Sequence, residues 1–473
     1  MIKKPNVLYI DCHDLGDWLG CYGRDYLNTP HLDKLATEGV RFDQYFSTAP
    51  ICQPSRVSMY AGKYPHEAGC LGQMPYDEDT PMIAQAFQAA GYRTINCGWN
   101  TKNKASWAGY ERSAPFKPSH PDSHTILEEL ASEQTDKPFF AHFAFSEVHR
   151  LFGNGYDPEL VDHIPLPEGY YEHEISRKDL ATLCRYVTEL DAHVGRILNA
   201  LEQNNLSQNT LIIFTTEHGA AILRAKHTMY DRAFKTTLLM RLPGVLPQGV
   251  VFPQMISSID LVPTIYELTD VAPQGNLSGQ SLCPLFSKEA QYCERKHIFF
   301  EHTWDRAGMG GPTAAQHTAN LYVPKRAVRT RQYKLVRHFT DLPNTIDSDW
   351  LERYRGVDNC LEEIQNAYGQ ASPEYELFDI QTDPEELHNL AKNPEYTDVL
   401  SKLKTRLQQH LEETNDPILQ GDVAHREGFE IETMWVKQKD GNYHFHPKCP
   451  RPDLNQGESP FWRIEKNEPG GLI

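Results

Sequence analysis

Short apolar runs alternate with longer amphipathic stretches through about the first 270 residues of the chain. The run NVLYI at 6–10 has the length and composition of a buried parallel strand, and polar residues follow it directly. Pro30 opens an amphipathic stretch that ends at Gly39, and further apolar runs occur at 138–145 and 210–219. Strands and helices that alternate in this way predict a mainly parallel sheet with helices on both faces.

The strongest helix prediction covers about 178–203. Apolar residues recur there at alternating steps of four and three, which places them on one face of a helix. The residues of this stripe are Leu183, Val187, Leu190, Val194, Ile197 and Leu201. Such a stripe is typical of a helix that packs on a core, so we assign it to packing rather than to a cofactor site.

After residue 284 the pattern changes. Residues 304–316 are rich in glycine and predict a loop, and residues 327–339 alternate in the manner of a hairpin. A smaller sheet-plus-helix unit should follow, closed by a helix at 398–413. We therefore expect a large α/β domain at 1–340, a small α+β domain at 341–420 and an extension at 421–473, which either wraps over the surface or stays a flexible tail.

Composition narrows the function. The chain has 473 residues with 46 basic and 64 acidic side chains, a formal charge of −18, which argues against nucleic-acid binding. An anionic ligand would then need a local basic pocket or a metal ion. No run of about 18 apolar residues occurs, so we expect no membrane span. The opening MIKKPNVLYID lacks the apolar core of a signal peptide. We expect a cytoplasmic protein, or a periplasmic or secreted one if a leader has been removed.

Ten cysteines are spread along the chain without a C-x-x-C pair or a zinc-site spacing, and most should be buried. Cys52 differs because it stands in the frame CQPSR. Pro54 suits the first turn of a helix, and the guanidinium of Arg56 suits an anion. A cysteine nucleophile needs a nearby base to form its thiolate, and the neighbouring sequence supplies none. The frame alone is as compatible with a structural role for Cys52 as with a catalytic one.

Together with RVSMYAGKYPHEAG at 56–69, the CQPSR frame resembles the type I sulfatase family of the alkaline phosphatase superfamily. Other segments resemble the same family in the family's order: NVLYIDCHDLGDWLGCYG at 6–23, TPHLDKLATEGVRFDQYF at 29–46, FTTEHG at 214–219, AKHTMYD at 225–231 and YELFDIQTDPEELHNLA at 375–391. Several motifs in order are more specific than one. The resemblance implies an α/β fold with a large, mainly parallel sheet flanked by helices and a smaller C-terminal α+β domain.

The resemblance also implies roles in the hydrolysis of a sulfate ester. Cys52 would be oxidised by a formylglycine-generating enzyme to formylglycine, whose hydrated aldehyde offers one hydroxyl to attack sulfur and another to expel sulfate. Arg56 would stabilise this group. Lys226 would reach the sulfate and the leaving oxygen, and His149 would donate a proton to the leaving group.

A divalent cation is implied as well, Ca²⁺ in the first place, with Mg²⁺ as the alternative. Asp14 matches the second of two adjacent family aspartates, but His13 stands at the place of the first. Asp11 lies one strand repeat earlier and can face the same way, and Ca²⁺ prefers oxygen, so we favour Asp11 over His13. The expected ligands are Asp11, Asp14, Glu217, His218 and the group made from Cys52.

One family element is absent. Where the family carries lysine, tryptophan and histidine after the GYRT strand, this chain has GWNTKNK at 98–104. Lys102 is the nearest cation and Asn100 a hydrogen-bonding neighbour. Lys102 would then replace the base that deprotonates the second hydroxyl, unless a residue of the C-terminal extension does so. Lys102 is equally compatible with a solvated surface position.

Four residues near predicted strand ends suit a sulfated sugar, because an indole can stack on a sugar face and cations can bind carboxylate or sulfate groups. They are Arg150, His302, Trp304 and Arg306, and each is equally compatible with ordinary surface. We expect a sulfatase acting on oligosaccharides from a sulfated polysaccharide. The alternatives are a phosphonate or phosphodiester hydrolase, a sulfamidase, and a non-catalytic sulfated-glycan binding protein with unconverted Cys52. Homo-oligomer formation is left open.

Overall fold

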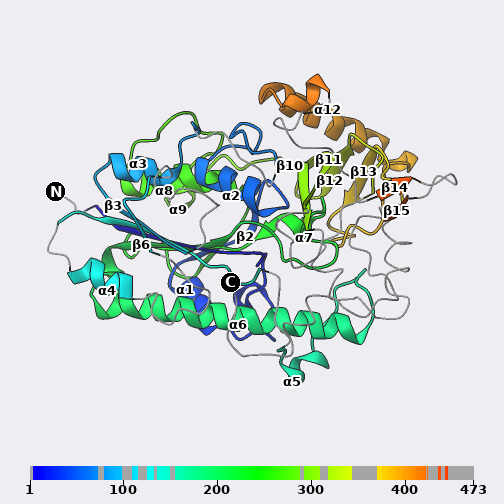
Figure 1. Ribbon diagram of the computed structural model, residues 1–473. Coiled ribbons are helices and arrows are strands. Elements are labelled where there is room, and N and C mark those ends of the chain that lie inside the picture. The colour runs from blue at the N-terminus through cyan, green and yellow to red at the C-terminus, as the bar shows by residue number, and fades with distance from the viewer. Residues whose placement is uncertain are drawn as a thin grey trace.

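The computed structural model describes residues 4–72, 79–98, 109–114, 125–132, 136–149, 155–287, 292–308, 318–343, 370–421, 423, 435–437 and 443–445. Within these ranges, no helix combines the length and the apolar character needed to cross a membrane. Two larger sheets and the helices packed on them make up most of the described chain (Figure 1).

Nine strands of the described chain form the first sheet. They are β1 (Asn6–Cys12), β2 (Val40–Phe46), β3 (Arg93–Gly98), β4 (Arg112–Ala114), β5 (Phe139–Ala144), β6 (Thr210–Thr216), β7 (Lys235–Thr236), β8 (Leu238–Arg241) and β9 (Val250–Ser257). Their spatial order is β4-β3-β5-β1-β6-β8-β2-β7, with β9 beside β2. The five strands from β4 to β6 are parallel, whereas β8 is antiparallel to both of its neighbours. The predicted mainly parallel sheet is confirmed.

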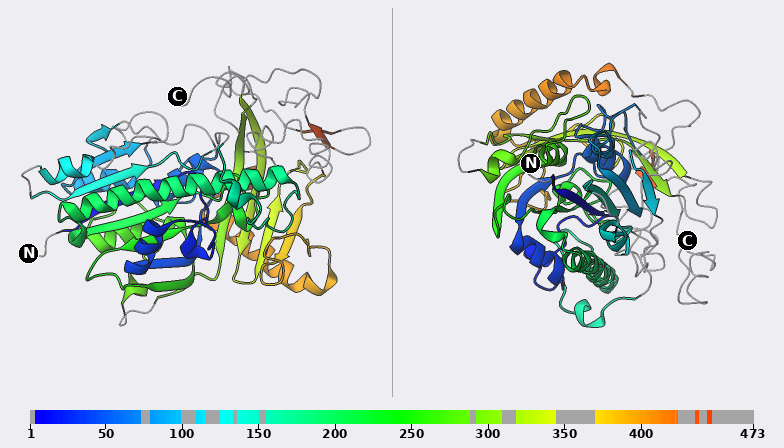
Figure 2. Two further views of the ribbon diagram at one scale, coloured as in Figure 1. Left: turned by 90° about the horizontal axis from the view of Figure 1, so that it is seen from below. Right: turned by 90° about the vertical axis from the view of Figure 1, so that its left-hand side faces the viewer.

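Helices cover both faces of this sheet (Figure 1). The helices on one face include α1 (Pro30–Glu38), α4 (Thr125–Ser132) and α6 (Glu174–Gln203), and α5 (Pro158–Val161) packs against α6. Those on the other face include α2 (Cys52–Ala61), α3 (Ile83–Ala89), α8 (Leu261–Thr269) and α9 (Cys283–Phe286). Figure 2 shows the long α6 lying along its face of the sheet. All six residues of the predicted stripe are buried in α6, so the predicted helix and its packing role are confirmed.

The second sheet is antiparallel and has the order β10-β11-β12-β13. Its strands are β10 (Ile298–Gly308), β11 (Thr318–Arg329), β12 (Tyr333–His338) and β13 (Tyr375–Asp379), and α12 (Thr397–Glu413) packs on it. The predicted hairpin at 327–339 corresponds to the turn between β11 and β12. The sheet takes strands from both sides of residue 340, where we expected a boundary, and the division into domains stays a prediction.

Only short pieces of the expected extension at 421–473 belong to the described residues. Among them β14 (Trp435–Lys437) pairs with β15 (Tyr443–Phe445) in an antiparallel hairpin. Most of the remaining residues of the extension lie outside the described ranges.

The second sheet is fixed beside the carboxyl edge of the first. The backbone N–H of Glu301 in β10 donates to the carbonyl of Thr48, which lies just before α2, at 2.9 Å. The N–H of Trp304 donates to the carbonyl of Leu71 at 2.9 Å. Because β1, β5 and β6 are parallel neighbours, the residues that follow them also meet at this edge. The short α7 (Asp231–Phe234) completes the border between the two sheets.

Candidate active site

Cys52 is the first residue of α2 and lies at the edge where β1 and β6 end. Its neighbour Ile51 has extended backbone angles, so the chain turns into the helix at this cysteine. Cys52 is only 9% exposed. Burial raises the pKa of its thiol well above the ordinary value, and the ammonium of Lys226 opposes this shift only in part. An unmodified thiol would therefore be protonated near neutral pH and would be a weak nucleophile.

Side chains from both strand ends converge on Cys52. The Nε2 atom of His218 lies 3.3 Å from the Cys52 sulfur and 3.3 Å from Oδ1 of Asp14. Ligand atoms of Asp14, Cys52, Glu217 and His218 all lie within 4.8 Å of one another. A second group, which shares Asp14 and Cys52, adds His13 and His149 within the same distance. The structure therefore brings together four of the five ligands expected from the sequence.

Asp14 is ionised in this cluster. The Nζ atom of Lys226 donates to its Oδ2 at 2.9 Å. Burial opposes ionisation of Asp14, but Lys226 and the surrounding imidazoles outweigh it and hold the pKa of the carboxyl well below its usual range. Asp14 also has a positive φ of 49°, in the tight turn that carries its side chain away from β1 toward Cys52.

Arg56 lies beneath this cluster, almost completely buried. Its guanidinium donates to Oδ1 of Asp11 at 2.9 Å and to Oε2 of Glu217 at 3.2 Å. Burial opposes ionisation of Glu217, but Arg56 and His13 outweigh it and lower the pKa of this carboxyl to about 2. Two carboxylates thus fix the one cation of the CQPSR frame.

Asp11 does not lie with the candidate ligands. Its Oδ1 accepts from Arg56, and its Oδ2 accepts from Nε2 of His142 at 3.0 Å and from the hydroxyl of Tyr60. The hydroxyl of Tyr110 in turn donates to Nδ1 of His142 at 2.7 Å. Both carboxylate oxygens of Asp11 are used inside this buried network.

His13 faces the candidate ligands from the end of β1. Its Nδ1 lies 2.9 Å from Oε1 of Glu217, and its ring packs edge to face against His149 at 5.1 Å between centroids. Burial and the positive charge of Arg56 lower the pKa of His13 to about 4, although Glu217 opposes the shift. Near neutral pH His13 is therefore an uncharged imidazole, the form that binds a metal.

The other expected site residues have mixed positions. Lys102, Asn100 and Arg150 lie outside the described residues, as does the side chain of Arg306. His302 and Trp304 are each 2% exposed. Nε2 of His302 lies 3.4 Å from Asp305, and the Trp304 ring packs on Tyr322 at 4.7 Å. A role for these two residues in sugar binding stays a prediction.

Sequence reasoning missed two histidines beside the site. His227 follows Lys226 and places its Nδ1 2.7 Å from Oδ2 of Asp305 on β10, which connects the lysine segment to the second sheet. His142 supports Asp11 from β5. A polar residue inside the apolar run PFFAHFAF was a visible signal for His142. No pattern marked His227, because its partner lies far away in the chain.

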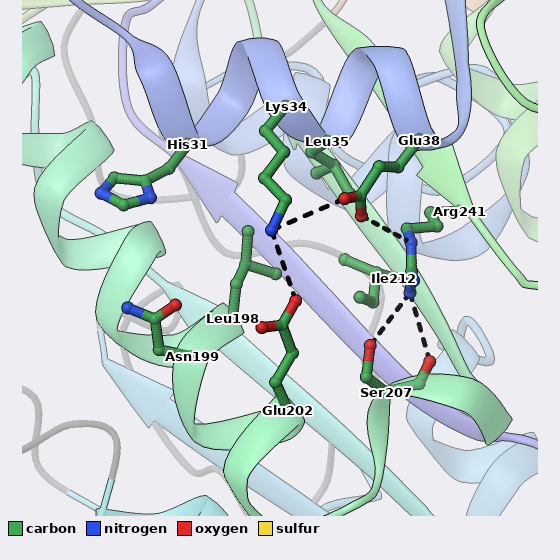
Figure 3. Close-up of a pocket in the computed structure, with 10 residues that line it drawn as sticks. All are labelled: His31, Lys34, Leu35, Glu38, Leu198, Asn199, Glu202, Ser207, Ile212 and Arg241. Carbon is green, nitrogen blue, oxygen red and sulfur yellow. Dashed lines mark hydrogen bonds and ion pairs between the residues drawn. The ribbon is translucent and has the colours of Figure 1, made fainter.

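The structure also contains a small cavity on the side of α1 and α6, away from Cys52 (Figure 3). Its volume is about 30 Å³, and Lys34, Glu38 and Arg241 form ion pairs around it. A cavity of this size holds no more than a few water molecules. It cannot admit a sugar, so we do not assign a substrate to it.

Comparisons with known proteins show the family of this chain. Residues 5–271 match the family model described as Sulfatase, and residues 217–370 match the model described as N-sulphoglucosamine sulphohydrolase, C-terminal. The first match covers more than half of the chain. It contains β1 to β9 and all the residues that converge on Cys52.

Relatives and solved structures cover most of the chain. It is 26% identical to an ulvan-active sulfatase of Formosa agariphila, over 88% of this chain and 76% of the relative. It is 24% identical to the N-sulphoglucosamine sulphohydrolase of Homo sapiens, over 88% of this chain and 90% of that relative. A solved 2-O GAG sulfatase has a TM-score of 0.65 at 20% identity, over 89% of this chain and 95% of that one. A solved phosphonate monoester hydrolase from Silicibacter pomeroyi has a TM-score of 0.62 at 19% identity, and the match covers 94% of this chain and 100% of that one.

Proposed function

Because this chain belongs to the sulfatase family and is a sulfuric ester hydrolase, we propose that it removes sulfate from oligosaccharides of a sulfated polysaccharide. The observation that carries the proposal is the convergence of Asp14, Glu217, His218 and Lys226 on Cys52. The names of several relatives support the substrate class, since they include ulvan-active, N-sulphoglucosamine and hexuronate-2-O sulfatases or sulphohydrolases.

We propose that Cys52 is converted to formylglycine by a formylglycine-generating enzyme. Once formed, this group supplies a hydrated aldehyde, in which one hydroxyl oxygen attacks sulfur and the other expels sulfate as the aldehyde carbonyl re-forms. The structure supports the proposal because the buried thiol is poorly ionised, as its raised pKa indicates, and is a weak nucleophile by itself.

The surrounding residues have separate tasks in this proposal. Arg56, held by Asp11 and Glu217, fixes the position of the group at residue 52. Lys226 binds a sulfate oxygen and neutralises charge on the leaving oxygen. His149 donates the proton that the leaving alcohol needs. Lys102 is predicted to be the base that deprotonates the second hydroxyl.

The residues around Cys52 also fit a divalent cation, because the ionised Asp14 and Glu217 and the uncharged imidazoles of His13 and His218 bring their ligand atoms together in one buried cluster. Asp14, Glu217 and His218 would hold it, with His13 at the place for which we expected Asp11. A bound cation would supply positive charge that polarises the sulfate. The donor set does not resemble the all-oxygen shell of Ca²⁺, the ion expected from the sequence.

Intact mass and product analysis test the proposal. Protein co-produced with a formylglycine-generating enzyme should be about 18 Da lighter than the thiol form and should release inorganic sulfate from sulfated oligosaccharides. Preference for aryl phosphonates or phosphodiesters would identify a hydrolase of that class, and preference for N-sulfated over O-sulfated sugar would identify a sulfamidase. Binding of sulfated glycan without turnover, by protein that keeps its thiol in its native host, would identify a binding protein.

Cys52→Ser provides the sharper test of the formylglycine step. Serine keeps one hydroxyl for attack on sulfur but lacks the second hydroxyl that expels sulfate. Turnover should therefore stop, while binding persists through Lys226, which the change leaves in place. Mass spectrometry should detect at most one sulfate added per chain, and Cys52→Ala, the matched control, should show none. Sustained turnover by Cys52→Ser would contradict the mechanism.

A further inference from the structure

We propose that the cation site of this enzyme selects a first-row transition ion, of the kind represented by Zn²⁺ and Mn²⁺, over Ca²⁺. The inference rests on the proposed function only in placing a cation beside Cys52. The inference is based on which ligand atoms, nitrogen, oxygen or sulfur, the described residues bring close together around Cys52.

Imidazoles make up half of the side chains proposed to hold the cation, His13 and His218 beside Asp14 and Glu217. The two overlapping ligand groups also contain the sulfur of Cys52 and the imidazole of His149, the proposed proton donor. Ca²⁺ takes about six to eight oxygen ligands, whereas imidazole nitrogen suits first-row transition ions. Even after Cys52 is converted, the imidazoles remain.

The hydrogen bonds of His218 prepare it as a ligand. Its Nδ1 donates to the backbone carbonyl of Gly219 at 2.8 Å, which places the proton on Nδ1 and leaves the lone pair on Nε2. That Nε2 is the atom that lies 3.3 Å from both Asp14 and Cys52. A backbone acceptor behind a buried imidazole is the arrangement that orients metal-binding histidines.

His13 changes the charge of the site. It stands where a carboxylate was expected, with Nδ1 2.9 Å from Oε1 of Glu217. Asp11 does not restore the missing charge, because Arg56, His142 and Tyr60 occupy its two oxygens. The cluster therefore offers two carboxylates where a hard cation would gain from three. Replacing a carboxylate by an imidazole therefore weakens the binding of Ca²⁺, which prefers oxygen ligands. It weakens the binding of a transition ion less, because such an ion can use the imidazole nitrogen as a ligand.

His13→Asp tests the inference, because it restores a carboxylate at that place. Metal-free full-length protein is titrated separately with Ca²⁺, Mn²⁺ and Zn²⁺ by calorimetry. The wild type should bind Mn²⁺ and Zn²⁺ more tightly than Ca²⁺, and His13→Asp should shift the ratio of the Ca²⁺ and Mn²⁺ dissociation constants at least ten-fold toward Ca²⁺. His163→Asp, an exposed position away from the cluster, is the matched control and should leave the ratio unchanged.

Two further measurements keep the test decisive if His13→Asp folds poorly. Pulsed electron paramagnetic resonance of the Mn²⁺-loaded wild type should show coupling to imidazole nitrogen. Repeating the titrations on Cys52→Ala removes the thiol contribution and should preserve the preference. Tighter binding of Ca²⁺ than of Mn²⁺ by the wild type, an unshifted ratio in a folded His13→Asp, or absence of nitrogen coupling would each overturn the inference. None of these readouts depends on sulfate release, so they fail independently of the proposed function.

Discussion

Asp11 shows how a buried side chain close to a site can be held by neighbouring protein groups. It is fully buried, and Arg56, His142 and Tyr60 surround its carboxylate. Burial opposes its ionisation, but Arg56 and His142 outweigh it and hold the pKa of Asp11 well below its usual range. The negative charge of Asp11 pairs with the guanidinium of Arg56, which also donates to Glu217.

Asp11→Asn should therefore act through Arg56. Removal of one partner from a buried ion pair costs about 3 kcal/mol of the free energy of unfolding, and kcat should fall because Arg56 loses its fixed position. Metal affinity should fall less than in His13→Ala. Thermal unfolding, steady-state kinetics and calorimetry measure the three quantities, with the exposed Asp25→Asn as the control. A larger loss of metal affinity in Asp11→Asn than in His13→Ala would make Asp11 the ligand.

At the level of single residues, the sequence predicted which motifs meet but not every partner within them. Asp14, Cys52, Glu217 and His218 were expected together because the family resemblance implies it, and they do lie together. Strand alternation also favoured Asp11 as a ligand, and that role stays a prediction. Alternation could not show that Arg56 of α2 donates to Asp11. Contacts between distant segments carry no local signal.

Among the elements, α6 is the one that the pattern of apolar residues predicted best. A long helix with a continuous apolar stripe has few alternatives, and the observed helix starts only four residues before the predicted one. The edges of the second sheet were harder to predict. β13 pairs with β12 although they are far apart in the chain, and no periodicity shows that pairing.

Leu190→Ala tests the packing role of α6. Leu190 is fully buried in the core between α6 and the sheet. Its truncation should lower the free energy of unfolding by about 2 to 5 kcal/mol, because transfer free energy is lost and a cavity remains. Denaturant unfolding measures this, and the exposed Gln203→Ala at the end of the same helix should change stability by less than about 0.5 kcal/mol. A value for Leu190→Ala as small as the control would show that α6 packs loosely.

At the scale of the whole molecule, the two sheets are joined by buried polar groups rather than by apolar contacts alone. His66, from the loop after α2, donates from Nδ1 to Oε2 of Glu301 on β10 at 2.6 Å. Arg326 on β11 forms a two-point ion pair with Asp416, which follows α12, at 2.6 and 2.9 Å. The loop that follows the Cys52 helix is thereby connected to the second sheet and to the segment beyond α12.

This junction should make stability depend on pH in a defined direction. Burial works against charge on His66, but the carboxylates of Glu301 and Asp416 outweigh it and raise the pKa of His66 above its ordinary value of about 6.5. A raised pKa means that the contribution of His66 is fully present below about pH 6.5 and is lost as pH rises through the folded-state value. The size of that contribution should be about 1.5 kcal/mol, as for a buried hydrogen bond to a charged group.

The prediction is tested by the difference in the free energy of unfolding between wild type and His66→Gln. Glutamine can still donate to Glu301 but carries no titrating charge, so the difference should be largest near pH 6 and should shrink by about 1.5 kcal/mol toward pH 9. His163→Gln, which changes an exposed histidine, is the control and should show no such trend. Because Glu301 and Thr48 share a backbone hydrogen bond beside α2, hydrogen exchange near Cys52 should also quicken as His66 loses its proton. A difference that stays constant or grows with pH would mean that His66 is uncharged in the folded protein.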